Sequence, residues 1–312
     1  MPAPIRTTLY TDAGCPWAYS AIPALRVLEW RYGSQLDWRL VMIGLTESSE
    51  QYVKRGYTTL RSARGQLSFR RFGMPFAPAP KARISATARA CRAIIAAGQI
   101  QAGAEWPALH ALQLSQFTSP VVLEDDEHIS RIVGAAIGVS PDTIHAALDS
   151  DAVTEAYQRD RAETRTAAGS PAELQDKTAT SDGPVRFTAP SVVFERDGQR
   201  LVAGGWQTIE AYDVLIANLD PTLTRRTPPE DVGELIEAFP QGLTTQEVTA
   251  LLVQGNDAED RKTAELALLD LVGEGRAVRL GVGDDALWVS PDEAEHQRAI
   301  LHEALEPEVA LH

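Results

Sequence analysis

The chain has 312 residues, of which 44% are hydrophobic and 23% charged, and its formal net charge is −14. This composition is that of a globular protein large enough for two domains, and no apolar run approaches the eighteen or so residues that span a membrane. The two cysteines, Cys15 and Cys91, are too few for a disulfide framework. Because the first residues lack the pattern of a secretory signal, the expected compartment is the cytoplasm, where thiols stay reduced.

A predicted strand at Ile5–Thr11 leads into a helix that begins at Pro16, so Cys15 stands where this helix starts. The first turn of a helix has unpaired N–H groups and a partial positive charge, which stabilise a thiolate. Proline suits this turn because its missing N–H would be unused there. Thiols in such a setting reach a pKa of roughly 3.5 to 7.5. We therefore expect Cys15 to be a largely ionised nucleophile, the alternative being a small buried hydrophobic residue.

The predicted helix continues to Tyr32 and is followed by a strand over residues 36–43, which completes a βαβ unit. Residues from 46 to about 165 carry helical patterns and no strand signal, so we expect an all-helical insertion between two halves of a sheet. Its Cys91 lies in an alanine-rich helix over residues 84–98 and is expected to be a packed core residue. Further helices are expected at 106–117, at 127–138 and after the N-cap Ser140. The histidines of this block show no ligand spacing, so no metal site is expected.

The sheet pattern resumes after a polar segment at 169–184, which we interpret as a loop or a lid. Residues 185–205 contain two alternating strands around Asp197-Gly198, the signature of a β-hairpin. A final helix is expected at 208–219. Pro190 stands at the mouth of the first of these strands, where it cannot donate to the ladder. It either begins an edge strand with a trans bond or forms a cis kink.

The order of these features resembles the DsbA-type thioredoxin-like fold, an α/β fold with an all-helical insertion, over residues 5–220. The resemblance rests on two motifs, Cys15-Pro16-Trp17-Ala18 at the helix start and Thr188-Ala189-Pro190 at the mouth of the hairpin. It is strongest to the FrnE-type dithiol oxidoreductases, whose Cys-Pro-Trp-Cys motif matches the first three positions. The chain is also similar to kappa-class glutathione transferases and 2-hydroxychromene-2-carboxylate isomerases.

This resemblance implies that Pro190 is cis and lies against Cys15. It also implies that the backbone at Ala189 pairs with a thiol substrate like an added strand. The remaining motif positions, namely Pro16, Trp17, Ala18 and Thr188, are expected to surround the substrate.

The sequence departs from the dithiol pattern at Ala18, where the relatives carry the cysteine that resolves the mixed disulfide. Cys91 could replace that cysteine only at a Cα separation of about 4.4 to 6.8 Å, which we do not expect. Our preferred hypothesis is a monothiol oxidoreductase in which an external low-molecular-weight thiol resolves the mixed disulfide formed by Cys15. Two alternatives stay open: a thiol-dependent transferase or isomerase, and a non-catalytic module that binds extended peptides or proteins. The expected partner is a thiol or disulfide, small or protein-bound, and no tightly bound cofactor is expected.

An acidic second domain is predicted after the first domain ends near residue 222. Residues 228–312 hold 19 acidic and five basic side chains, which accounts for the whole net charge. Three helices and a hairpin within 228–292 resemble a small α+β winged helix, and residues 293–312 are expected to form a C-terminal helix or tail. Because phosphate contacts supply much of the affinity for DNA, this negative charge disfavours nucleic acid and favours protein contacts or a homodimer.

Overall fold

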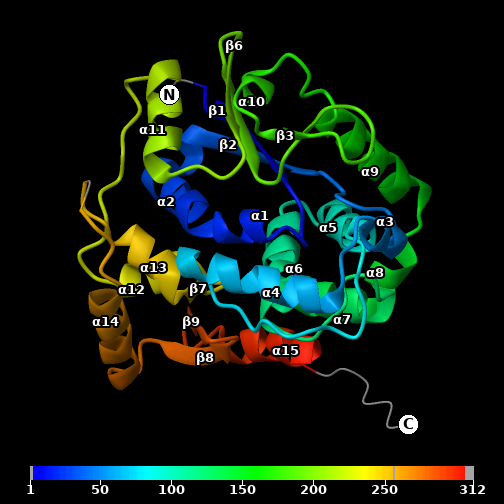
Figure 1. Ribbon diagram of the computed structural model, residues 1–312. Coiled ribbons are helices and arrows are strands. Elements are labelled where there is room, and N and C mark those ends of the chain that lie inside the picture. The colour runs from blue at the N-terminus through cyan, green and yellow to red at the C-terminus, as the bar shows by residue number, and fades with distance from the viewer. Residues whose placement is uncertain (1–2, 256, 306–312) are drawn as a thin grey trace, which may run out of the picture.

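The computed structural model describes residues 3–255 and 257–305 of the chain (Figure 1). Within these residues the central sheet has four strands in the order β2-β1-β5-β6. Their bounds are Ile5–Thr11 for β1, Leu36–Met42 for β2, Ser191–Arg196 for β5 and Gln199–Gly204 for β6. Strand β1 runs parallel to β2 and antiparallel to β5, with Leu9 between Leu40 and Val192. The βαβ unit and the hairpin predicted from the sequence are therefore confirmed.

Helices of the sheet domain follow the predicted order. Their bounds are Pro16–Ser20 for α1, Ile22–Tyr32 for α2, Gly33–Gln35 for the short 3-10 helix η1 and Ile209–Leu219 for α11. Leu28 of α2 and Tyr212 of α11 are buried against Leu9 of the sheet. The expected single helix over residues 16–32 is divided at Ala21, because Pro23 has no N–H to donate to the preceding turn.

The helical insertion lies between β2 and the second half of the sheet, as predicted, and forms the right-hand part of Figure 1. Its elements are α3 (Ser49–Lys54), α4 (Thr59–Phe69), η2 (Arg70–Phe72), α5 (Ala88–Ile100), α6 (Glu105–Thr118), α7 (Asp126–Ile137), α8 (Pro141–Ala147) and α9 (Asp151–Thr164). The Ser140 side chain caps α8 by accepting from the N–H of Thr143. Helix α5 begins later than predicted because the N–H groups of Thr87 and Ala88 both donate to the carbonyl of Thr46 in the preceding loop. Among the described residues no helix combines the length and apolar character needed to cross a bilayer.

The polar segment before the hairpin is more ordered than a plain loop. It contains α10 (Pro171–Leu174) and the strand β3 (Thr178–Ala179), which pairs with β4 (Arg186–Phe187) as a small antiparallel sheet. The turn between β5 and β6 has positive φ at both Asp197 and Gly198, as a two-residue hairpin turn requires.

The acidic C-terminal region forms the lower part of Figure 1. Its elements are α12 (Gly233–Ala238), β7 (Leu243–Thr244), α13 (Thr245–Leu251), α14 (Arg261–Gly273), β8 (Val278–Val282), β9 (Asp285–Val289) and α15 (Ala294–Leu305). The strands pair in the order β7-β9-β8. Residues 306–312 of the predicted C-terminal helix or tail lie outside the described residues.

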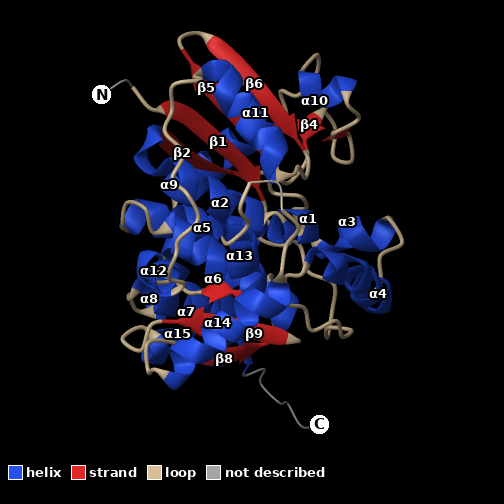
Figure 2. Cartoon of the chain, turned by 90° about the vertical axis from the view of Figure 1, so that its left-hand side faces the viewer, coloured by secondary structure: helices blue, strands red, loops and turns tan. Residues whose placement is uncertain are grey.

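This region shares its hydrophobic core with the rest of the molecule. Trp30 of α2 is buried together with Leu235 and Val248, and the Arg26 guanidinium of α2 lies 3.1 Å from the buried carboxylate of Glu247. Figure 2 shows α2 and α13 in the middle of the molecule, between the large sheet and the strands β8 and β9. The predicted boundary therefore separates two regions of sequence that pack closely in space.

The turn of the β8–β9 hairpin docks on the segment around Phe76. Gly283 has a φ of +54°, and a Cβ placed there would lie 2.9 Å from the carbonyl carbon and oxygen of Phe76. The next residue, Asp284, accepts a 2.8 Å hydrogen bond from the Phe76 N–H.

We predict that Gly283→Ala destabilises the protein more than Gly275→Ala. Gly275 also has a positive φ, but nothing lies within 4 Å of its ideal Cβ position. The control Gly275→Ala should lower the free energy of unfolding by about 1 kcal/mol because of the strained φ. Gly283→Ala should lower it by about 2 kcal/mol more, because its Cβ would overlap the backbone of Phe76. Urea unfolding measures both, and equal losses would contradict the docking of the hairpin on Phe76.

Candidate active site

Cys15 is the N-cap residue of α1, and its thiol faces the backbone just before Pro190. The Sγ atom lies 3.2 Å from the carbonyl oxygen of Ala189, to which the thiol donates. The Ala189–Pro190 peptide bond is cis. The structure thus brings together the two motifs that lie about 174 positions apart in the sequence.

The Cys15 side chain is only 6% exposed. Burial, together with a smaller effect of the nearby Asp12 carboxylate, raises the pKa of Cys15 to about 12. The N–H groups of Ala18 and Trp17 at the start of α1 lower the pKa, but burial outweighs them. The prediction of an ionised thiolate at neutral pH is therefore wrong for this arrangement, in which the thiol is protonated.

Asp12 organises the loop that carries Cys15, and sequence reasoning assigned it no role. Its fully buried carboxylate accepts from the N–H groups of Gly14 and Leu45, both at 2.9 Å, and from the Thr87 hydroxyl at 2.8 Å. Burial raises the pKa of Asp12, while these hydrogen bonds lower it. The sequence did offer a signal for this role of Asp12. The residue is acidic, follows a buried strand directly and stands three positions before a cysteine.

Cys91 is buried in the core, as predicted, but it also reaches the active-site loop. Its Sγ lies 3.6 Å from the Oδ2 atom of Asp12. Burial raises the pKa of Cys91 well above its usual value, and the Asp12 carboxylate adds to this shift. Both cysteines are free thiols.

The other motif residues differ in exposure. Trp17 is 40% exposed and packs against Phe69 at 5.0 Å between ring centroids. Ala18 points inward and is buried in the same cluster as Cys15. Pro16 and Thr188 are half-buried, and the Thr188 hydroxyl donates to the carbonyl of Lys177 at 2.9 Å. The position of the expected second thiol is thus occupied by a buried methyl group.

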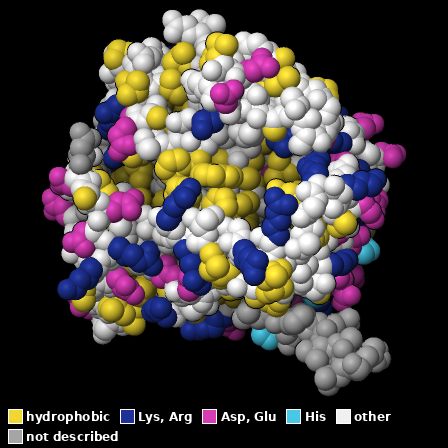
Figure 3. All heavy atoms as spheres, viewed as in Figure 1, with side chains coloured by type: hydrophobic (Ala, Val, Ile, Leu, Met, Phe, Trp, Pro, Cys, Tyr) yellow, Lys and Arg dark blue, Asp and Glu magenta, His cyan; other side chains and the backbone are white. Residues whose placement is uncertain are grey.

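A cavity of about 720 Å³ opens beside the motif, with Gly14, Pro16 and Trp17 on its wall. Four cationic residues line it and no acidic residue does: Arg61, Arg64, Lys81 and Arg83. Burial lowers the pKa of Lys81 to about 7, and its Nζ donates to the carbonyl and side-chain oxygens of Gln116 at 2.7 and 2.8 Å. Figure 3 shows the face over α1 hollowed between the β5–β6 hairpin and α4, with hydrophobic side chains in the hollow and Lys or Arg side chains beside it. This surrounding suits an anionic molecule.

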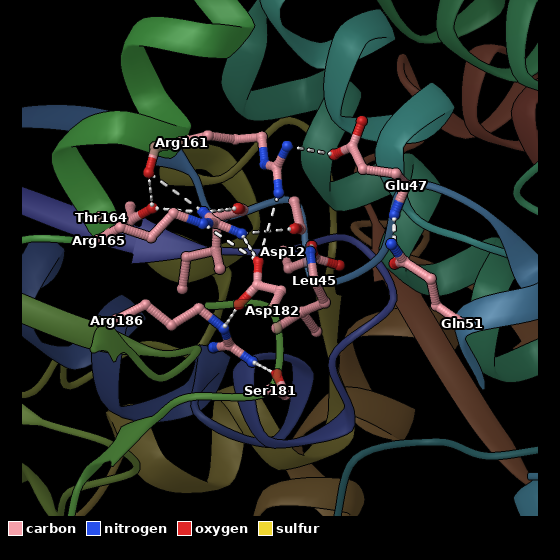
Figure 4. Close-up of polar contacts among 12 residues, drawn as sticks. Asp12, Leu45, Glu47, Gln51, Arg161, Thr164, Arg165, Ser181, Asp182 and Arg186 are labelled. Atoms are coloured by element: carbon pink, nitrogen blue, oxygen red, sulfur yellow. Dashed lines mark hydrogen bonds and ion pairs between the residues drawn. The ribbon is translucent and has the colours of Figure 1, made fainter. Parts of the chain in front are cut away.

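Three arginines hold the segment that leads to Pro190 (Figure 4). Arg161, Arg165 and Arg186 all pair with the carboxylate of Asp182, whose side chain is 8% exposed. Arg165 also donates to the carbonyl of Ile43 at 2.8 Å, so the cluster ties this segment to α9 and to the end of β2. The positive charge of Arg186 also lowers the pKa of Cys15.

Within residues 3–255 and 257–305, no group of three or more His, Cys, Asp and Glu side chains is arranged to hold a metal ion.

The profile of the DSBA-like thioredoxin domain matches residues 7–185. This chain belongs to the DSBA-like thioredoxin domain family. The members of this family are thiol-disulfide oxidoreductases or isomerases. The matched residues contain the Cys15 motif and the whole helical insertion, and they end just before β4.

Two solved structures share the fold. A protein from Nitrosomonas europaea, provisionally described as a protein disulfide isomerase, is similar with a TM-score of 0.53 and 15% identity, over 69% of this chain and 97% of its own. A probable DsbA oxidoreductase from Streptomyces coelicolor is similar with a TM-score of 0.50 and 16% identity, over 72% of this chain and 93% of its own. None of the curated proteins matches the chain.

We predict that the Cys15 thiol of this DSBA-like protein stays protonated in the free state. With its pKa raised to about 12 by burial, only roughly one Cys15 in a thousand is ionised at about pH 9. The thiolate absorbance in the ultraviolet, taken as the difference between the wild type and Cys15→Ser, measures this. The urea-unfolded protein serves as the control and should titrate near the ordinary value of about 8.5. If the Cys15 thiol of the folded protein titrates with a midpoint below about pH 8, this prediction is wrong and Cys15 is substantially ionised near neutral pH.

Asp182→Asn should destabilise the protein by about 3 kcal/mol, because it leaves buried arginines without their counter-charge. The control is Asp197→Asn, since Asp197 is 89% exposed and its pair with Arg196 contributes little. Burial opposes ionisation of Asp182, yet Arg165, Arg186 and Arg161 hold its pKa below the usual range. The wild-type protein should therefore have a higher free energy of unfolding than Asp182→Asn at pH 7. This difference should decline below about pH 4, where Asp182 becomes protonated. Urea unfolding at several pH values measures this, and equal losses for the two variants would disprove the role of the cluster.

Proposed function

We propose that the protein catalyses thiol-disulfide exchange through Cys15 alone, with an external low-molecular-weight thiol completing the cycle. The observation that carries this proposal is the placement of the Cys15 thiol at the start of α1, 3.2 Å from the Ala189 carbonyl. Membership of the DSBA-like family supports the chemistry. Ala18 leaves the motif without a second thiol, so the resolving thiol must come from outside it.

The exchange balances without a further oxidant. The Cys15 thiolate attacks one sulfur of a substrate disulfide, a new S–S bond forms, and the other substrate sulfur leaves as a thiolate that takes up a proton. An external thiolate then attacks the substrate sulfur of the mixed disulfide and releases Cys15. The net change converts one disulfide and one thiol into another disulfide and another thiol.

Ionisation of Cys15 is coupled to substrate binding in this proposal. In the free protein the protonated thiol donates a hydrogen bond to the Ala189 carbonyl. A substrate strand that pairs with Ala189 offers an N–H to the same carbonyl and takes this acceptor away from the thiol. The N–H groups of Trp17 and Ala18 then favour the thiolate. In this proposal the pKa of Cys15 falls when the disulfide binds, because the hydrogen bond that stabilised the protonated thiol is lost.

The cationic cavity is the proposed site of the small co-substrate. Arg61, Arg64 and Arg83 line it beside Pro16 and Trp17, so an anionic thiol or disulfide reaches the motif in a favourable field. No tightly bound cofactor takes part. We propose the cytoplasm as the compartment, since external thiols are kept reduced there.

We predict that oxidised glutathione, an anionic disulfide, forms a mixed disulfide with the protein that intact mass spectrometry detects. Cystamine, a cationic disulfide, should form its adduct about tenfold more slowly than oxidised glutathione at low salt. High salt should reduce this ratio of rates because it screens the charges. Cys15→Ser should abolish the adduct, whereas the matched control Cys91→Ser should keep it. An adduct that persists in Cys15→Ser, or no adduct with either disulfide, would refute the oxidoreductase.

A second candidate, a thiol-dependent transferase or isomerase, is favoured by one specific observation. A protonated Cys15 can donate a hydrogen bond to the thiolate of a bound co-substrate, as it does to Ala189 in the free protein. Saturable binding of reduced glutathione without any disulfide adduct would support this candidate. Absence of both the adduct and the binding would leave the peptide-binding module as the function.

A further inference from the structure

Helix α4 presents an outer face that is both apolar and cationic. Leu60 and Leu67 are 49% and 50% exposed, and their spacing of seven residues places them on one side of the helix. Arg64 lies between them on the same side. Figure 3 shows hydrophobic side chains beside Lys and Arg side chains on this part of the surface. An exposed patch of this kind is typical of a contact with another molecule.

The positive charge of this face is not neutralised within the described residues. Residues 51–104, which include α4, contain ten basic side chains and no acidic one. Arg70 lies 2.8 Å from the carboxylate of Asp284, but Arg64 and Arg71 form no ion pair in the described part of the chain. The partner that fits α4 therefore carries acidic and apolar side chains together.

Helix α14 presents a face that fits this description. Three residues bury its inner side in the C-terminal core: Ala264, Leu268 and Leu271. Three apolar residues on its outer side stay between 37% and 53% exposed: Leu266, Leu269 and Val272. Glu265 and Asp270 stand beside them in the helix, and neither forms an ion pair within residues 3–255 and 257–305. Because a helix that is apolar on two sides is typical of one covered on both, α14 is suited to a second contact.

The outer faces of α4 and α14 complement each other, but they do not meet within one chain. Figure 2 places α4 at the right-hand side of the molecule and α14 in its lower middle, and Figure 1 also shows them apart. Charges more than about 8 Å apart are largely screened at physiological ionic strength. The local pairing of a basic face with an acidic one therefore counts more than the net charge of each copy, and a second copy is the partner that fits both faces.

We propose that α14 of one copy of this chain docks on α4 of a second copy. The exposed leucines of the two helices pack together, and Arg64 of α4 lies opposite Asp270 of α14. Because two different surfaces meet, a pair of copies keeps one uncovered α4 and one uncovered α14, so that further copies can add. The contact is independent of the proposed exchange reaction, since Cys15 takes no part in it.

Sedimentation velocity of the full chain measures this self-association. The wild type should associate with a midpoint below about 100 µM at physiological salt. Arg64→Glu and Asp270→Arg should each weaken the association at least about tenfold, because like charges then face each other. The variant that combines Arg64→Glu with Asp270→Arg should associate like the wild type, since it reverses both charges of the pair and leaves the net charge unchanged.

The matched controls lie away from both helices. Arg159→Glu makes the same change of net charge as Arg64→Glu at a side chain that is 69% exposed, and it should leave the association unchanged. Leu269→Ser should weaken the association at least about tenfold. Leu174→Ser, at an 85% exposed position of α10, should leave it unchanged. Because the replaced side chains are all exposed, far-ultraviolet circular dichroism should show the wild-type fold in each variant.

Three results would overturn the docking of α14 on α4. The first is a wild type that stays monomeric at about 300 µM, and binding of that monomer to vesicles of anionic phosphatidylserine would assign α4 to a membrane surface instead. The second is wild-type association of both single charge reversals, which would place the contact on other surfaces. The third is a double reversal that associates as weakly as the single ones, which would mean that Arg64 and Asp270 do not meet.

Discussion

The site depends on the hydrogen bonds that the buried carboxylate of Asp12 accepts. It accepts from Gly14 in the cysteine loop, from Leu45 after β2 and from Thr87 at the start of α5. Hydrogen bonds to a charged group contribute about 1.5 to 3 kcal/mol each, and a buried carboxylate without them would be very unfavourable. The end of β1, the loop after β2 and the helical insertion are therefore locked together around the residue that precedes the Cys15 loop.

This arrangement controls the thiol in two opposing ways. The helix start offers N–H groups that favour a thiolate, but burial and the neighbouring Asp12 charge favour the protonated form and prevail. Reactivity of a cysteine follows its thiolate character and its exposure. A single buried thiol is thereby protected from indiscriminate oxidation, which is valuable in a motif where Ala18 offers no second thiol to resolve an unwanted adduct. Our proposal that Cys15 acts only with a bound substrate and an external thiol rests on this geometry.

Much of the fold was predictable because its signals are local. Alternating strands, the Asp197-Gly198 turn and the Ser140 cap each act over a few residues, and all three are present in the structure. The predicted helix bounds were wrong where a distant residue, or a proline within the helix, changed the backbone hydrogen bonds. Pro23 divides the first helix, and Thr46 takes the N–H groups that would have extended α5. The segment over 169–184 was predicted as a loop because its only strand, β3, has two residues. A strand of that length gives no alternating pattern in the sequence, and it is recognised only from its pairing with β4.

The sequence by itself determined that Cys15 begins a helix, that Ala18 replaces a second thiol, and that a hairpin opens at Pro190. Only the tertiary structure decided how these features act. Three features depend on segments far apart in the chain: the burial of the Cys15 thiol, its contact with Ala189 and the convergence of cationic side chains around one cavity. The physical reason is that local patterns set backbone conformation, whereas burial and electrostatic surroundings are properties of all the elements that pack around a group.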